Sequence, residues 1–128
     1  MLGNTNPKVE QFILEQIDSV PHLEALLLMW NSRPQKWSVQ EMAKALYVPF
    51  EVAEKVLADL EGRDLIAVAP DATDTYVYHA SVDRDALLKD VDATYRSQLI
   101  RVSGLIHSKA SAAVRDFARA FRFKKDRD

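Results

Sequence analysis

The chain of 128 residues contains no cysteine, so it can form no disulfide bond and offers no thiolate to a substrate or a metal. Its three glycines stand far apart, which excludes a glycine-rich loop that cradles phosphate. The most apolar stretch, residues 23–30, is much shorter than the ~20 residues that cross a bilayer. No charged-then-apolar leader opens the sequence, and we expect a cytoplasmic protein.

Recognisable catalytic and metal-binding patterns are also missing. His22, His79 and His107 are isolated, and no H-x-x-x-H or H-E-x-x-H spacing directs two imidazoles at one metal ion. No serine lies in a G-x-S-x-G context. The aspartates between residues 83 and 92 lie near a predicted helix start, where they favour the helix dipole. The sequence therefore predicts a protein without enzymatic activity, cofactor or metal.

Basic side chains are scarce in the first part of the chain, although the net charge of the whole chain is only −2. Residues 1–78 hold six basic and twelve acidic side chains, a net charge of −6, so residues 79–128 carry +4. Most of this positive excess follows Lys109. Such a separation bears on the choice of partners and not on the fold.

Two helices are expected before residue 34. Asn6-Pro7 is a typical helix start, and apolar residues then recur at helical spacing up to Ile17. Pro21 opens a second helix that is apolar on most sides up to Trp30, which is typical of a buried central helix.

The stretch from residue 38 to residue 78 predicts two short helices and a hairpin. Ser38-x-x-Glu41 is a capping box, and Pro49 starts the next helix after a two-residue link. Gly62 is placed to close that helix in the left-handed conformation. Two β-prone runs, 65–68 and 76–78, flank a polar tip and indicate a hairpin.

A long helix over residues 82–107 is predicted to follow, with an apolar stripe at heptad spacing. We expect this stripe to form a dimer, although the helix could instead fold back on its own domain. The stripe consists of Leu88, Val91, Tyr95, Gln98, Val102 and Leu105. The chain therefore divides into a domain over residues 1–80 and a helical arm over residues 81–128.

The arm ends in a basic amphipathic tail, residues 111–125. Val114, Phe117 and Phe121 share one face of a helical wheel. The basic side chains beside and after this face are Arg115, Arg119, Arg122, Lys124 and Lys125. Acidic protein, nucleic acid and an anionic membrane are its three plausible targets, and the acidic first half of the chain is the nearest.

The order of these elements resembles the bacterial winged helix-turn-helix superfamily, which includes MarR-, PadR- and ArsR-type regulators. The resemblance covers roughly residues 20–80, and its carrying stretches are WSVQEMAKAL, PFEVAEKVLADLEGRDLI and the hairpin to TYVYHA. The run SVPHLEALLLMW…WSVQEMAKAL…VAEKVLADLEGRDLIAV…AVRDFARAFRFKKD also looks like small bacterial winged-helix proteins of unassigned function. This implies a mainly α fold with a small β-hairpin wing and a C-terminal helical arm.

The resemblance assigns the helix over residues 49–61 as the recognition helix and residues 70–74 as the wing tip. The surface positions of this recognition helix are Phe50, Glu51, Glu54, Lys55 and Asp59, and those of the wing are Asp71, Thr73 and Asp74. Because DNA affinity rests on neutralising phosphates, this acidic set favours protein contact. DNA binding of the MarR or PadR type is the main alternative.

An effector-binding or membrane-surface-associated regulator is a further alternative. Four aromatic residues could line an effector pocket, although core packing is the favoured explanation because Trp30 falls on a buried stripe. They are Trp30, Trp37, Tyr47 and Phe50.

Overall fold

The first helices begin where the sequence provides capping side chains. The computed structural model describes residues 6–70, 74–79 and 81–108. Asn6 Oδ1 accepts from the backbone N–H of Lys8 at 2.9 Å, and Ser19 caps the second helix. The capping box is present, with Ser38 and Glu41 bonded reciprocally at 2.8 and 3.0 Å. The helices are α1 (Pro7–Gln16), α2 (Val20–Asn31) and α3 (Val39–Leu46).

The second helix of the pair, α4 (Phe50–Gly62), ends differently from the prediction. Gly62 is its last helical residue, and no described glycine has a positive φ. The left-handed conformation lies two residues later, at Asp64, with φ of 61°. Aspartate tolerates this region better than most residues, so the turn into the sheet does not need the glycine.

A three-stranded antiparallel sheet follows, in the order β1-β3-β2. The expected hairpin is confirmed: Ile66 pairs with Tyr78, and Val68 pairs with Tyr76. Sequence reasoning missed the third strand, which has two residues and no alternating pattern to reveal it. The strands are β1 (Trp37–Ser38), β2 (Ile66–Val68) and β3 (Thr75–Tyr78).

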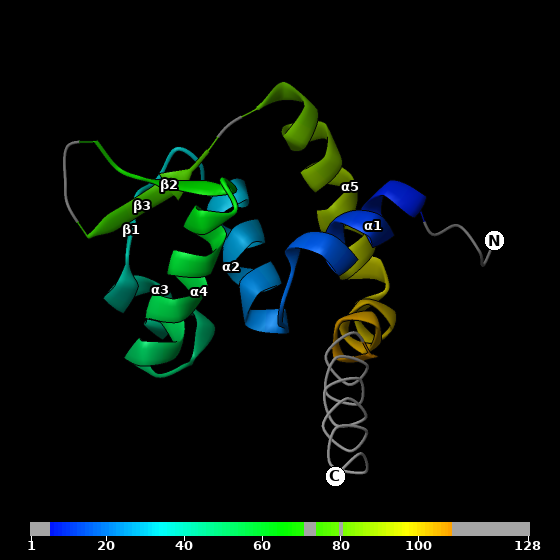
Figure 1. The fold of residues 1–128 in the computed structure, drawn as a ribbon, viewed down its shortest axis with the longest axis horizontal. Coiled ribbons are helices and arrows are strands. Elements are labelled where there is room, and N and C mark those ends of the chain that lie inside the picture. The colour runs from blue at the N-terminus through cyan, green and yellow to red at the C-terminus, as the bar shows by residue number, and fades with distance from the viewer. Residues whose placement is uncertain (1–5, 71–73, 80, 109–128) are drawn as a thin grey trace, which may run out of the picture.

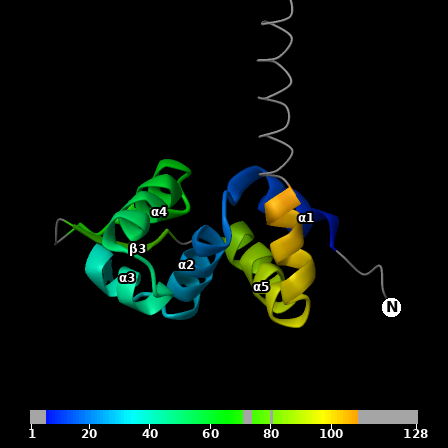
Figure 2. The ribbon, with the colours of Figure 1, turned by 90° about the horizontal axis from the view of Figure 1, so that it is seen from below.

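The predicted helix over residues 82–107 is not continuous. Helix α5 (Val82–Ser97) ends at Gln98, whose φ of −133° and ψ of 48° are not helical. Residues 99–108 are helical again, and the chain changes direction at this point (Figure 2). The heptad pattern runs through the break, so periodicity alone did not reveal it.

The core joins the winged-helix elements to the arm. Helix α2 passes through the middle of the molecule, with α3, α4 and the sheet on one side and α1 and α5 on the other (Figure 1). Leu26, Leu57 and Leu88 belong to one cluster of buried side chains, although they come from three different helices. The core thus crosses the boundary expected near residue 80. No helix among the described residues is long and apolar enough to cross a membrane.

The architecture is mainly helical with a small antiparallel sheet, as the sequence predicted. Helices α3 and α4 pack together, and β2 and β3 follow them as the wing. This arrangement leaves the outer side of α3 and α4 facing solvent.

Candidate functional site

The outward side of α4 is acidic and carries one basic residue. Glu51, Glu54 and Lys55 are exposed on its first two turns. The Lys55 ammonium lies 3.0 Å from Asp59 Oδ2, one turn further along the helix. Because Lys55 is paired within α4, it leaves the two glutamates without a neutralising partner on that helix.

The turn between α3 and α4 exposes aromatic side chains next to these carboxylates. Tyr47 has the left-handed conformation, with φ of 58°, and its side chain is 94% exposed. Phe50, the first residue of α4, is 49% exposed. The two border an open groove of about 900 Å³ that is lined by Gln40, Ala43, Lys44 and residues 47–50. Large exposed apolar side chains beside a groove are typical of a contact surface.

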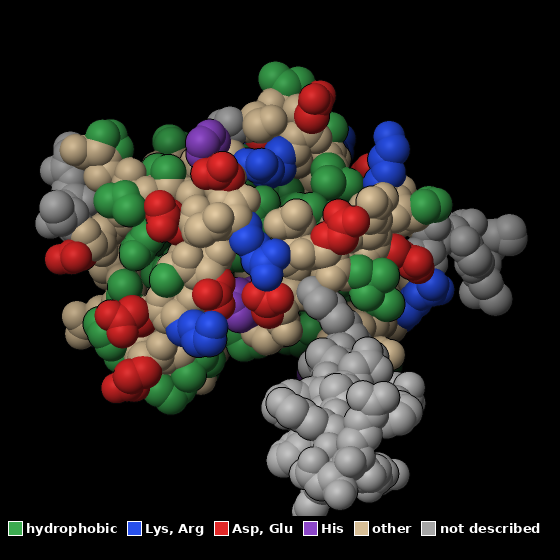
Figure 3. Space-filling view, viewed as in Figure 1, with side chains coloured by type: hydrophobic (Ala, Val, Ile, Leu, Met, Phe, Trp, Pro, Cys, Tyr) green, Lys and Arg blue, Asp and Glu red, His purple; other side chains and the backbone are tan. Residues whose placement is uncertain are grey.

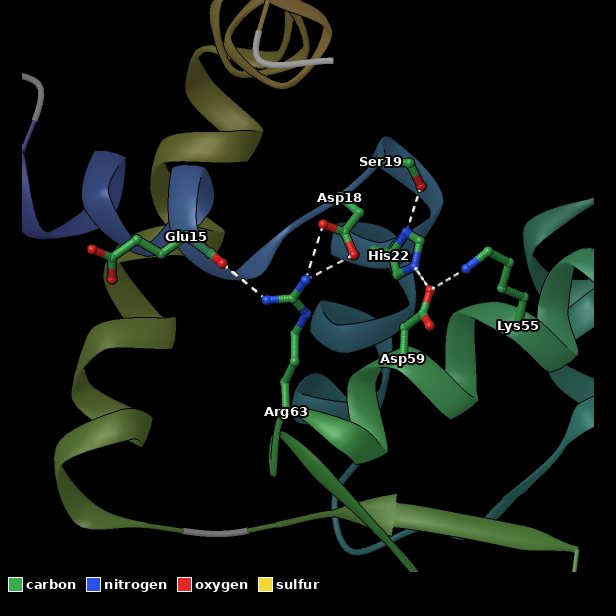
Figure 4. Close-up of polar contacts among 7 residues, drawn as sticks. All are labelled: Glu15, Asp18, Ser19, His22, Lys55, Asp59 and Arg63. Atoms are coloured by element: carbon green, nitrogen blue, oxygen red, sulfur yellow. Dashed lines mark hydrogen bonds and ion pairs between the residues drawn. The ribbon is translucent and has the colours of Figure 1, made fainter. Parts of the chain in front are cut away.

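Near the C-terminal end of α4, a buried histidine joins this helix to α2. His22 is only 6% exposed. Its Nδ1 lies 2.6 Å from Ser19 Oγ, and its Nε2 lies 2.8 Å from Asp59 Oδ2 (Figure 4). The hydrogen bond from His22 lowers the pKa of Asp59; burial opposes this effect, and Lys55 adds to it. Asp59 is therefore a structural carboxylate as well as a surface one.

A second contact, one turn further along, fixes the C-terminal end of α4. Arg63, which follows the helix, donates to both carboxylate oxygens of Asp18 at 3.1 Å and to the carbonyl of Glu15 at 2.9 Å. These partners lie in and after α1 (Figure 4). Sequence reasoning missed both contacts because the residues are 37 to 48 positions apart and form no local motif.

The same network brings three potential metal ligands together. One ligand atom from each of Asp18, His22 and Asp59 lies within 4.8 Å of the others. The sequence predicted no metal because the histidines are isolated. Here Arg63 and Lys55 already contact the two carboxylates, and His22 uses both ring nitrogens. The carboxylates of Asp18 and Asp59 are therefore neutralised by basic side chains of the same chain.

The wing adds no described basic residue to this side of the molecule. Asp74 is exposed with φ of 69°, whereas Asp71 and Thr73 lie outside the described residues. Carboxylates and hydrophobic side chains gather over α3 and α4 (Figure 3). Among the described residues from α3 to β3, three basic side chains (Lys44, Lys55, Arg63) stand against seven acidic ones: Glu41, Glu51, Glu54, Asp59, Glu61, Asp64 and Asp74.

The four aromatic residues considered for an effector pocket are not brought together in this groove. Trp30 is buried, with the Arg33 guanidinium 4.6 Å from its ring centre. Trp37 donates from Nε1 to Ser32 Oγ at 3.1 Å. Of the four, Tyr47 and Phe50 line the groove.

The apolar stripe expected to form a dimer is largely covered within one chain. Leu88, Val91 and Val102 are buried in the core. Tyr95 and Leu105 are partly buried against the same core, and Tyr95 donates to Glu24 Oε2 of α2 at 3.0 Å. Gln98 marks the break in the helix. The basic tail residues Arg115, Arg119, Arg122, Lys124 and Lys125 lie outside the described residues.

Comparison with known proteins bears on the fold. No protein-family model and no curated protein matches the sequence. Among solved structures, the chain is similar to MepR, a transcription regulator of the Staphylococcus aureus multidrug efflux pump MepA. The TM-score is 0.50 at 15% sequence identity, and the alignment covers 89% of this chain and 87% of that chain. This likeness confirms the winged-helix fold that the sequence predicted.

Proposed function

We propose that this chain is a non-enzymatic regulatory module that uses its winged helix to bind a protein. The contact surface consists of the α3–α4 turn and the first two turns of α4. The observation that carries this proposal is that Tyr47 and Phe50 are exposed beside Glu51 and Glu54. Aromatic side chains are enriched at protein interfaces, and the glutamates complement a basic partner.

The electrostatics of the surface argue against tight DNA binding through α4. A winged helix that reads DNA inserts the first turns of its recognition helix into the major groove. Affinity there depends on releasing counterions from phosphates by means of lysine and arginine. In α4 those turns carry Glu51 and Glu54, which form no ion pair with any described residue, and Lys55 is held by Asp59. A glutamate can accept a hydrogen bond from cytosine, but it cannot attract the backbone.

A DNA-binding regulator is the second candidate, favoured by the structural likeness to a transcription regulator. The two candidates differ in their response to salt and to charge. We expect the unmodified protein to bind random duplex DNA weakly and without sequence preference at physiological salt. A selection from random oligonucleotides that yields one sharp palindromic motif would establish DNA reading instead.

The protein-binding proposal is tested by cross-linking in cells followed by quantitative mass spectrometry. Replacing Tyr47 and Phe50 with serine removes apolar contact area from the exposed side of the groove. The matched control is Val82→Ser, which changes an exposed apolar residue on a different helix. We expect one partner to be enriched by the unmodified protein and the control, and lost by the double variant. Equal capture by all three proteins would contradict the proposal.

A further inference from the structure

We propose that residues 111–125 of this chain dock on the surface formed by Tyr47, Phe50, Glu51 and Glu54, and so compete with an external partner for it. This inference rests on the proposed function, because it names an occupant for the same surface. While the tail occupies this surface, a partner must displace it before binding.

The surface is complementary to an occupant that is both apolar and basic. Tyr47 and Phe50 provide apolar area beside the groove of about 900 Å³. Glu51 and Glu54 stand next to this area, and the only basic side chain on α4, Lys55, is paired with Asp59. Lys44 also lines the groove, but it belongs to α3. Acidic residues therefore prevail on the α4 side of the groove.

The tail has the complementary composition. Phe117 and Phe121 are four residues apart and fall on one side of a helix. Lys124 and Lys125 are three and four residues beyond Phe121, so they continue the same side one turn later. In the tail, two phenylalanines are followed by two ammonium groups. On the surface, Tyr47 and Phe50 are followed by the carboxylates of Glu51 and Glu54, which have the opposite charge. Since exposed ion pairs contribute little, the phenylalanines provide most of the affinity and the lysines fix the orientation.

The length of the tail and its attachment make the contact feasible. Twenty residues follow Ser108, the last described residue, and with residues 109–110 extended and residues 111–125 helical the tail reaches roughly 30 Å. Because the tail is tethered, its effective concentration at the surface is high, so a weak contact can still be well populated. The charges of −6 over residues 1–78 and +4 over the remainder favour the same contact.

The absence of cysteine provides a direct test on the full chain. Asp116→Cys creates a single attachment site for a nitroxide spin label in the middle of the tail. Nuclear magnetic resonance at low ionic strength then reports which backbone amides the label broadens. We expect broadening at residues 44–51, in addition to residues near 116 in sequence. Broadening confined to the neighbours of residue 116 would overturn the proposal.

Charge reversal sharpens the test. Glu51→Lys with Glu54→Lys should weaken the broadening at residues 44–51, and adding Lys124→Glu with Lys125→Glu should restore its full strength. Asp90→Lys reverses an exposed carboxylate on α5 and should leave the broadening unchanged. Undiminished broadening in the double glutamate variant would show that the tail does not recognise these carboxylates and would overturn the assignment.

Mixing experiments identify which copy provides the tail. Isotope-labelled chain without the nitroxide is mixed with unlabelled chain that carries it, and broadening in the mixture means docking between copies. Broadening only when one chain carries both labels means docking within a copy; either result supports the proposal. If the tail leaves residues 44–51 unaffected while the Tyr47 and Phe50 variant still loses its partner, docking fails and the proposed function stands.

Discussion

His22 and Asp59 show how a single buried contact sets the position of a functional helix. They are 37 positions apart in the chain, and their 2.8 Å contact joins α2 to α4. His22 lies in the interior, so losing its partner would leave a donor without a hydrogen bond. The exposed face of α4 therefore depends on a residue that no surface pattern reveals.

Replacing Asp59 with alanine should destabilise the chain by about 1–3 kcal/mol, the typical cost of leaving a buried donor without a partner. Asp59→Asn should cost less, because the amide oxygen can still accept from His22 Nε2. Lys55→Ala removes only an exposed ion pair within α4 and should cost less than about 1 kcal/mol. Urea unfolding measures all three variants, and equal losses for Asp59→Ala and Lys55→Ala would contradict the structural role of Asp59.

Tyr95 should make the stability of the chain sensitive to alkaline pH. Burial, followed by the hydrogen bond to Glu24, raises the pKa of Tyr95 from 10.0 to about 12. Between these values the unfolded chain loses the phenolic proton and the folded chain keeps it, so the free energy of unfolding falls as pH rises. Tyr95→Phe should weaken this fall when unfolding is measured across the window. An unchanged fall in Tyr95→Phe would contradict this role of Tyr95.

At the level of whole elements, the sequence predicted what local chemistry determines. Capping residues located the starts of α1 and α3, and the β-prone runs located β2 and β3. The misses lie where distant packing decides: a two-residue strand, a helix broken at Gln98 and a left-handed turn at Asp64. The network of His22, Asp59 and Arg63 was missed for the same reason, because its partners meet only in the folded chain.

The helical segment over residues 99–108 belongs to the folded body, and its removal from the core should be costly. Ile106 is fully buried, and Arg101 pairs with Glu10 of α1 at 2.8 Å. Ile106→Ala should lower the free energy of unfolding by about 2–4 kcal/mol through lost burial and the cavity that remains. Ile100→Ala, on the exposed side of the same segment, should change it by less than about 0.5 kcal/mol. Comparable effects in thermal or urea unfolding would mean that this segment does not pack on the core.

The surface through which two copies could meet depends on which apolar side chains the folded chain leaves exposed. Heptad spacing placed a dimer seam at Leu88, Val91 and Val102, but these side chains are buried within one chain. Leu88→Glu should therefore lower the melting temperature and not simply separate two folded copies. A dimer needs another apolar surface, and Leu99 and Ile100, 51% and 87% exposed, provide one beside the break at Gln98.

We predict that the unmodified protein is dimeric at micromolar concentration and that Leu99→Ser with Ile100→Ser yields monomers. Because both side chains are exposed in the single chain, the double variant should retain its melting temperature apart from any contribution of dimerisation itself. Light scattering gives the mass, and a dilution series of melting temperatures separates folding from association. Val82→Ser serves as the control and should remain dimeric, because Val82 is as exposed as Ile100 but lies at the start of α5. A monomeric mass for the unmodified protein would mean that each winged helix acts alone, with its acidic α4 surface presented once per molecule.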